Sequence, residues 1–104
     1  MTNKLPIPAG WLPLVDDLKQ RAASEFRSLV FVDISAHPGG WLNVEIDKHS
    51  VSVEQHWRAL KLGEGYSSMS LNICAECCRH HAERRPDHVF PICDYCRQRI
   101  DSNN

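Results

Sequence analysis

The stretches that decide the fold of this chain are Cys74-Ala75-Glu76-Cys77 and Cys93-Asp94-Tyr95-Cys96, two cysteine pairs separated by fifteen residues. Each pair can present two thiolates from one tight turn, and four thiolates suit a tetrahedral Zn²⁺ ion. The sequence therefore predicts a zinc site. Its ligands are expected to be Cys74, Cys77, Cys93 and Cys96. A closed four-thiolate site leaves no position for water or substrate, so the expected role of the zinc is structural.

Other candidate ligands lie close to these pairs. Cys78 directly follows Cys77, and the connecting loop holds His80, His81 and His88, any of which is an alternative ligand. Two adjacent thiols do not easily bind one ion from a regular knuckle, so the preferred interpretation of Cys78 is a partly buried free thiol. A thioredoxin-like role for either pair requires a preceding βαβ unit, which the sequence does not indicate.

Composition limits the range of functions. The 104 residues are 42% hydrophobic and 24% charged, which is typical of one domain or of a small domain with a metal-stabilised appendage. Twelve basic side chains face thirteen acidic ones, and residues 74–104 hold five of each sign. The basic field of a non-specific nucleic-acid binder is therefore missing. Without a signal-like N-terminus or a membrane-length apolar run, we expect a cytoplasmic protein whose paired cysteines hold metal rather than form disulfides.

The N-terminal half predicts a helix followed by a hairpin. Residues 1–10 contain two prolines and no periodicity, and are interpreted as an extended lead-in. A helix is expected over about 12–26, because apolar residues recur there at helical spacing. A strand over 28–34, a turn at 37–40 and an alternating strand over 41–47 follow. The alternation directs Leu42, Val44 and Ile46 toward the first helix.

A second helix is expected after a capping box that begins at Ser52. Its apolar stripe is formed by Val53, Trp57 and Leu60, and Gly63 is interpreted as the residue that ends it. The conformation of residues 63–73 stays open. A terminal helix beginning near Cys93 completes a finger of the treble-clef or zinc-ribbon kind.

The predicted fold class is therefore α+β, with the order helix, two-stranded antiparallel hairpin, helix and C-terminal zinc finger. The expected division of the chain is an extended lead-in at 1–10, a small α+β unit at 11–70 and a zinc-binding module packed on it at 71–104.

Candidate partner-binding residues lie in the hairpin and in the loop between the cysteine pairs. Trp11 and Trp57 are expected in the core, whereas Trp41 begins the polar face of its strand and either binds a partner or closes the core. Acidic residues of that face either meet a basic partner or are simply solvated, and the basic loop either grips phosphate or an acidic surface or covers the metal. The candidates are Trp41, Glu45, Asp47, Arg79, Arg84 and Arg85.

Several motifs together resemble a known group. They are Gly10-Trp11-Leu12-Pro13-Leu14-Val15, then Gly39-Gly40-Trp41-Leu42, then Ser70 four residues before Cys74, and finally Ile92-Cys93-Asp94-Tyr95-Cys96. In these the chain resembles a group of small, largely uncharacterised bacterial and phage proteins. A lysine-rich segment of that group is replaced here by residues 32–38. The resemblance implies a helix, two strands, a helix and a zinc module, and a prokaryotic or phage setting.

Catalytic motifs are not evident. His37, His49 and His56 are scattered, and no glycine-rich phosphate loop is present. We therefore expect a non-enzymatic protein-interaction module, either an adaptor or a phage-type inhibitor of a host machine. The alternative is nucleic-acid binding through the arginines of the finger, and a third hypothesis is redox or metal sensing through Cys78.

Overall fold

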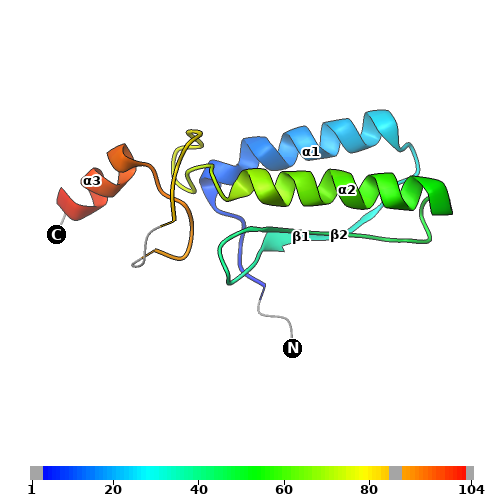
Figure 1. Cartoon of the computed structure of the whole chain (residues 1–104), viewed down its shortest axis with the longest axis horizontal. Helices are drawn as coiled ribbons and strands as arrows, with labels where there is room; N and C mark the ends of the chain where they lie inside the picture. Colours follow the sequence, from blue (N-terminus) through cyan, green and yellow to red (C-terminus); the bar gives the residue numbers. More distant parts are fainter. Residues whose placement is uncertain (1–3, 85–87, 103–104) are drawn as a thin grey trace.

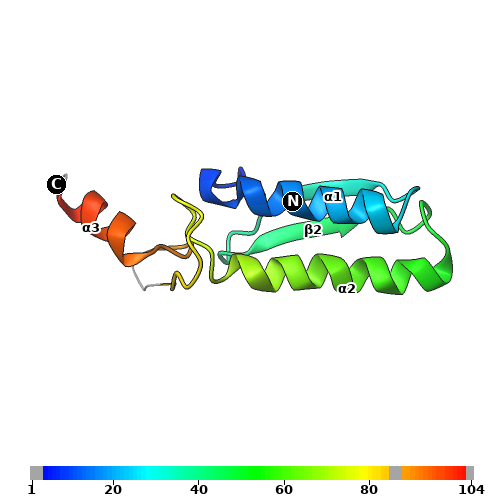
Figure 2. The same ribbon diagram turned by 90° about the horizontal axis from the view of Figure 1, so that it is seen from above.

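The computed structural model describes residues 4–84 and 88–102. A short 3₁₀ turn, η1 (Ala9–Trp11), leads into α1 (Leu12–Glu25), and the hairpin strands β1 (Phe31–Ala36) and β2 (Leu42–Ile46) follow. They are followed by α2 (Val53–Ser70), the cysteine-bearing segment and α3 (Asp94–Ser102). The predicted order of helix, antiparallel hairpin, helix and cysteine cluster is confirmed. Figures 1 and 2 show α1 and α2 side by side over the hairpin, with α3 at one end of the elongated molecule.

The first helix forms as its periodicity predicts. Leu14, Val15, Leu18 and Ala22 are buried on one side of α1, and a proline occupies its first turn, where a missing N–H costs nothing. The helix ends at Glu25, one residue before the predicted boundary, because Phe26 leaves the helical conformation with φ −136°. Its ring is buried.

The hairpin begins later than predicted. β1 starts at Phe31 rather than at residue 28, because the preceding polar groups bond elsewhere. The Ser28 hydroxyl donates to the Ser50 carbonyl, and the Val30 N–H donates to Ser50 Oγ. The strands pair with Ala36 opposite Leu42, and the register shifts between Phe31 and Asp33.

The second helix corrects two predictions. It does not end at Gly63 but continues to Ser70, and its buried side is formed by Ala59, Gly63, Tyr66 and Ser70. A Cβ atom at position 63 would lie 3.2 Å from Val44 Cγ1, so the missing side chain lets α2 approach β2. The expected apolar stripe faces outward instead: Val53 is 79% exposed and Trp57 is 64% exposed. Trp57 therefore does not belong to the core.

The lead-in pairs with the hairpin. Leu5 and Ala36 exchange two backbone hydrogen bonds of 2.9 and 3.0 Å, and Ile7 packs against the core. Lys4 lies 3.4 Å from an Asp33 carboxylate oxygen. The lead-in thus extends the β1 edge of the sheet.

Trp11 joins the helical unit to the cysteine-bearing segment. It is fully buried, as predicted, and its indole N–H donates to the Ile73 carbonyl over 2.9 Å. Its ring meets Phe90 edge-on at 5.3 Å. One residue earlier, the Gly10 N–H donates to the Ala75 carbonyl over 2.7 Å. These contacts fix the place of the cysteine cluster relative to α1.

Candidate metal centre

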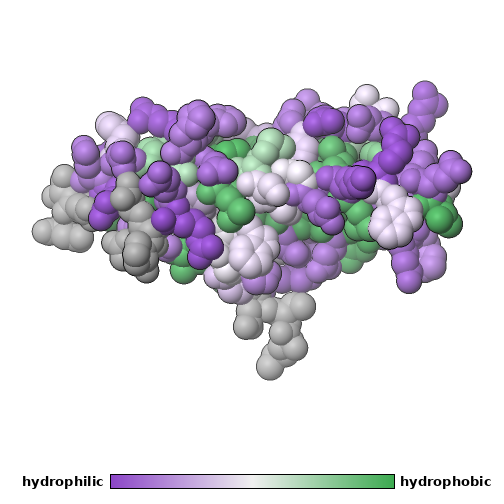
Figure 3. Space-filling view, viewed as in Figure 1, coloured by the Kyte–Doolittle hydropathy of each residue, from purple (hydrophilic) through white to green (hydrophobic). Residues whose placement is uncertain are grey.

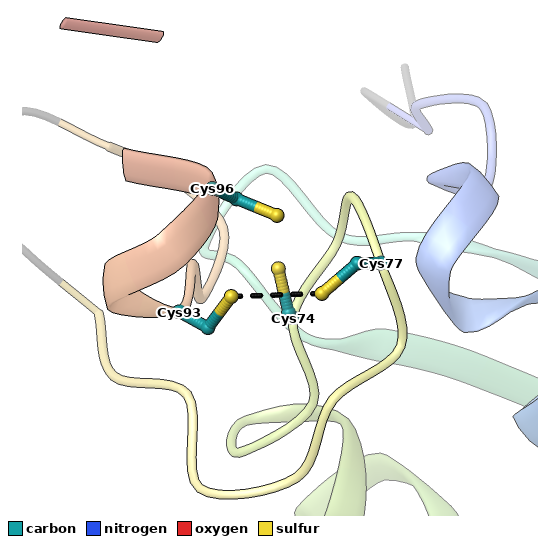
Figure 4. A group of neighbouring side chains, drawn as sticks. All are labelled: Cys74, Cys77, Cys93 and Cys96. Atoms are coloured by element: carbon teal, nitrogen blue, oxygen red, sulfur yellow. Dashed lines mark hydrogen bonds between the residues drawn. The ribbon is translucent and has the colours of Figure 1, made fainter. Parts of the chain in front are cut away.

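The four predicted ligands meet at the end of the molecule opposite the α1–β1 connection. Cys74 and Cys77 lie in the turn after α2, Cys93 directly precedes α3, and Cys96 lies in its first turn. Figure 4 shows the four side chains gathered around one point, and their sulfur atoms all lie within 4.8 Å of one another. The group that the described residues form contains neither Cys78 nor any of the three candidate histidines.

Donor chemistry and spacing fit a tetrahedral metal ion. A zinc–sulfur distance of about 2.3 Å implies sulfur–sulfur distances of about 3.8 Å at the edges of the tetrahedron. The Sγ atoms of Cys77 and Cys93 lie 3.5 Å apart, far beyond a disulfide bond, and all five cysteines are free. The four cysteines are thus positioned to bind a metal ion.

Backbone hydrogen bonds shape the first knuckle. The Cys78 N–H donates to the Cys74 carbonyl over 3.1 Å, and the Cys74 N–H donates to the Arg79 carbonyl over 2.8 Å. The Glu76 N–H lies 3.4 Å from Cys74 Sγ, where it can neutralise thiolate charge. Cys78 itself adopts φ +65°, the left-handed conformation that a glycine often supplies. Its side chain is exposed, so the expectation of partial burial was wrong: the residue serves the turn and not the apolar interior.

Backbone hydrogen bonds connect the second knuckle to the first knuckle and to the loop between them. The Ala75 N–H donates to the Pro91 carbonyl over 2.9 Å, and the Ile92 N–H donates to the Glu83 carbonyl over 3.1 Å. Cys74, Ala82, Ile92 and Cys96 form a small buried cluster of their own. Ala82 and Ile92 therefore give the thiols an apolar base.

The thiols differ in their readiness to ionise. Burial opposes ionisation of Cys93, but hydrogen bonds from the Cys96 amide and from the neighbouring thiols outweigh it and lower the Cys93 pKa to about 7. Burial is the main cause that raises the pKa of Cys77 and of Cys96. Metal binding therefore has to displace protons from the site.

The predicted partner-binding residues that the structure describes have different surroundings. Trp41 is 36% exposed and stacks on His37 with a ring distance of 4.1 Å. Glu45 lies 3.8 Å from Lys4, and an Asp47 carboxylate oxygen accepts the His49 N–H within a turn. The expected acidic strip is thus largely engaged within the molecule.

Two arginines of the loop between the cysteine pairs contact different parts of the molecule. The Arg79 guanidinium lies 4.7 Å from the centre of the Tyr95 ring on α3. Arg84 approaches Gly40, beside Trp41: its Nε would lie 3.2 Å from a Cβ atom at position 40. Arg85 lies outside the described residues.

Sequence reasoning missed two surface features. The first is the outward apolar pair Val53 and Trp57, which the sequence assigned to the apolar stripe of the second helix. The second is a groove of about 520 Å³ between β2 and α2. The small residues on α2, Ala59 and Gly63, are the sequence signal that marks the side of the helix facing this strand.

Comparison with known protein families, with curated proteins and with solved structures gives no significant match. The fold and the site therefore define the class by themselves: a small α+β protein with four cysteines positioned to bind a metal ion.

Proposed function

We propose that this protein is a zinc-stabilised, non-enzymatic interaction module that binds another protein through α2 and the adjoining hairpin. It would act as an adaptor or as an inhibitor of a larger machine. The zinc holds the C-terminal segment in place and takes no part in chemistry, because four cysteines complete its coordination.

The exposure of Trp57 carries the proposal. Trp57 and Val53 lie four residues apart and so share one side of α2, with 64% and 79% of their surfaces exposed. Leu60 and Glu64 continue that side and line the groove toward β2, whose far end is formed by Trp41. Figure 3 shows hydrophobic side chains interrupting the hydrophilic surface on the side where α2 lies. Exposed tryptophan beside other apolar residues is typical of a binding surface.

An affinity experiment tests the proposal. Zinc-loaded protein is used to capture partners from the native host lysate after nuclease treatment, at low and at high salt. We expect a protein partner that survives high salt with the wild type and is lost with Trp57→Ala. Met69→Ala is the matched control, since Met69 is a partly exposed apolar residue of α2 that lines a different groove. Retention of no protein, or equal retention by Trp57→Ala, would contradict the proposal.

Zinc itself requires a separate measurement. We expect one zinc ion per chain by elemental analysis of protein purified without added metal. Cys78→Ser should keep the ion, because Cys78 is outside the cluster, whereas Cys93→Ser should lose it.

A second candidate function rests on Tyr95. This side chain is 53% exposed and lies near two guanidinium groups, with Arg79 at 4.7 Å and Arg99 at 6.0 Å from its ring centre. Aromatic rings flanked by arginines bind single-stranded nucleic acid by stacking and phosphate contacts. This hypothesis predicts binding that weakens steeply with salt and fails when Arg84 and Arg85 are replaced by glutamine. Protein binding through α2 should survive that replacement.

A further inference from the structure

The outer edge of β2 carries backbone groups that are directed away from the sheet. At one end of the hairpin, Ala36 and Leu42 are opposite each other but bond outward: Ala36 to Leu5, and Leu42 to two serines of α2. In an antiparallel ladder the bonding direction alternates, so Ser35 and Asn43 bond to each other and Val44 bonds outward. The Asp47 N–H donates to the Val30 carbonyl across the hairpin. Because the direction alternates, the backbone groups of the preceding residue, Ile46, also point outward.

A groove accompanies this edge. Val44 and Ile46 line one wall of the 520 Å³ groove, and Ala59, Leu60 and Gly63 of α2 line the other. Figure 2 shows α2 running alongside β2 on the side away from β1. Glu64, Ser67 and Ser68 add polar groups to the α2 side, so the outward N–H and C=O groups of Val44 and Ile46 meet a groove with both apolar and polar lining.

The opposite edge of the same sheet is already extended. Leu5 adds to β1 through two backbone bonds with Ala36, so an isolated β-bridge from the chain itself occupies that edge. On the β2 side, Ser70 accepts the Leu42 N–H over 2.8 Å and Ser67 donates to the Leu42 carbonyl over 2.6 Å. These two serines cover the edge at Leu42, and the structure provides no such side-chain cover at Val44 or Ile46 within the described residues.

We propose that a partner protein adds an extended segment to this edge of β2, as an added strand lying in the groove that β2 and α2 line. This inference rests on the proposed function and specifies its partner: a chain segment of alternating apolar residues that carries a lysine or arginine. Main-chain hydrogen bonds to Val44 and Ile46 hold the segment, and its alternate side chains contact the apolar residues Ala59, Leu60 and Gly63 on α2.

Charge supports a basic segment. Among the described residues that line the groove, Glu64 alone carries a charge, and it lies on the exposed side of α2. An added strand with one basic side chain near Glu64 gains an ion pair, whereas an acidic one is repelled. Glu45 belongs to the same hairpin but does not line the groove, and it lies 3.8 Å from Lys4.

The first test uses a random linear peptide library displayed on phage, selected against the folded, zinc-loaded full-length protein. We expect enrichment of peptides with alternating apolar residues and a lysine or arginine. Two N-methylated versions of an enriched peptide are compared, one methylated at odd positions and one at even positions. Because only every second N–H faces β2, one version should bind about tenfold more weakly or worse, and the other should bind as the unmodified peptide does. Glu64→Lys should weaken binding about fivefold or more, whereas Glu45→Lys should not.

The second test measures the hydrogen-exchange rates of the backbone amides of β2. In the free protein, the amides of Val44 and Ile46 should exchange much faster than those of Asn43 and Glu45, which bond to β1. Bound peptide should protect Val44 and Ile46 and leave the other two unchanged. The proposal would be overturned if no peptide were selected, if both methylated peptides bound equally, or if the Val44 amide exchanged at the same rate with and without peptide. Protection that rises with protein concentration alone would also overturn it, because the occupant would then be a second copy of this chain.

The same measurement separates this proposal from the proposed function. If a captured lysate protein depends on Trp57 but leaves exchange at Val44 unchanged, the interaction module stands and strand addition fails. If the lysate yields no protein partner at all, the proposed function fails whatever the peptides do.

Discussion

Gly10 lies where the backbone of the cysteine knuckle passes close to the start of α1. A Cβ atom at position 10 would lie 2.1 Å from the Cys74 carbonyl oxygen and 2.5 Å from the Ala75 carbonyl carbon. Backbone atoms cannot rotate away as a flexible side chain can. The knuckle and the helix can therefore approach each other only because residue 10 has no side chain.

The first prediction follows from this approach. We expect Gly10→Ala to lower the free energy of unfolding by about 2 kcal/mol or more, as measured by urea titration of zinc-loaded protein. Gly65→Ala is the matched control: a Cβ atom there meets nothing within 4 Å, and the residue is inside α2. It should stabilise by about 0.5–1 kcal/mol. Equal stability of Gly10→Ala and wild type would refute this account of the joint.

Asp33 provides a residue-scale prediction about pH. A hydrogen bond from the Ser35 hydroxyl is the main cause that lowers the Asp33 pKa below its usual value, and Lys4 and Asn43 add to it. Because the folded pKa is the lower one, the stabilisation is complete above the unfolded pKa of about 4 and is lost as pH falls through the folded pKa.

We therefore expect Asp33→Asn to lower the free energy of unfolding by up to about 1 kcal/mol near neutral pH. Below about pH 3 the difference between the variant and the wild type should become smaller. Thermal unfolding across this range measures the difference. A gap that widens in acid would show that the sign is wrong.

At the scale of elements, serine side chains attach α2 to β2. The fully buried Ser70 accepts the Leu42 N–H and donates to the Ser67 carbonyl, while the Ser67 hydroxyl donates to the Leu42 carbonyl. Both backbone groups of a buried strand residue are satisfied by the neighbouring helix instead of by a third strand. These hydrogen bonds fix where α2 lies along the length of β2.

Ser70→Ala should destabilise the protein by about 1–3 kcal/mol, because the Leu42 N–H loses its acceptor in a buried position. Ser68→Ala, at an exposed neighbouring position of α2, should change stability by less than about 0.5 kcal/mol. Chemical unfolding of both variants decides the matter. Similar small effects of the two replacements would mean that water takes over the role of Ser70.

At the scale of the whole molecule, the metal site and the helical core depend on each other. Trp11 of η1 belongs to the main hydrophobic core, but it also donates to Ile73 and meets Phe90, which lie on either side of the first cysteine pair and its loop. If the cysteine cluster loses its structure, contacts are therefore lost from the core as well as from the finger. Metal-binding free energy contributes directly to folding in sites of this kind.

We expect Cys96→Ser, or removal of zinc by a chelator, to unfold at least the residues after about 71 and to lower the melting temperature of the rest. Amide NMR spectra of the zinc-loaded and zinc-free protein measure both effects, with Cys78→Ser as the control that keeps the native spectrum. Zinc-free protein that retains native-like dispersion and cooperative unfolding in this segment would contradict the structural role.

The sequence by itself determined the order of elements, the extent of α1, the burial of Trp11 and the four cysteines of the metal site. These features depend on local spacing: helical periodicity, strand alternation and paired cysteines act over a few residues. Only the tertiary structure decided which side of α2 is buried, since Val53 and Trp57 fit a helical stripe as well as Ala59, Gly63, Tyr66 and Ser70 do. The small residues Ala59 and Gly63 mark the buried side only once β2 is known to pack there, because the contact of Gly63 with Val44 joins residues that are far apart in the sequence.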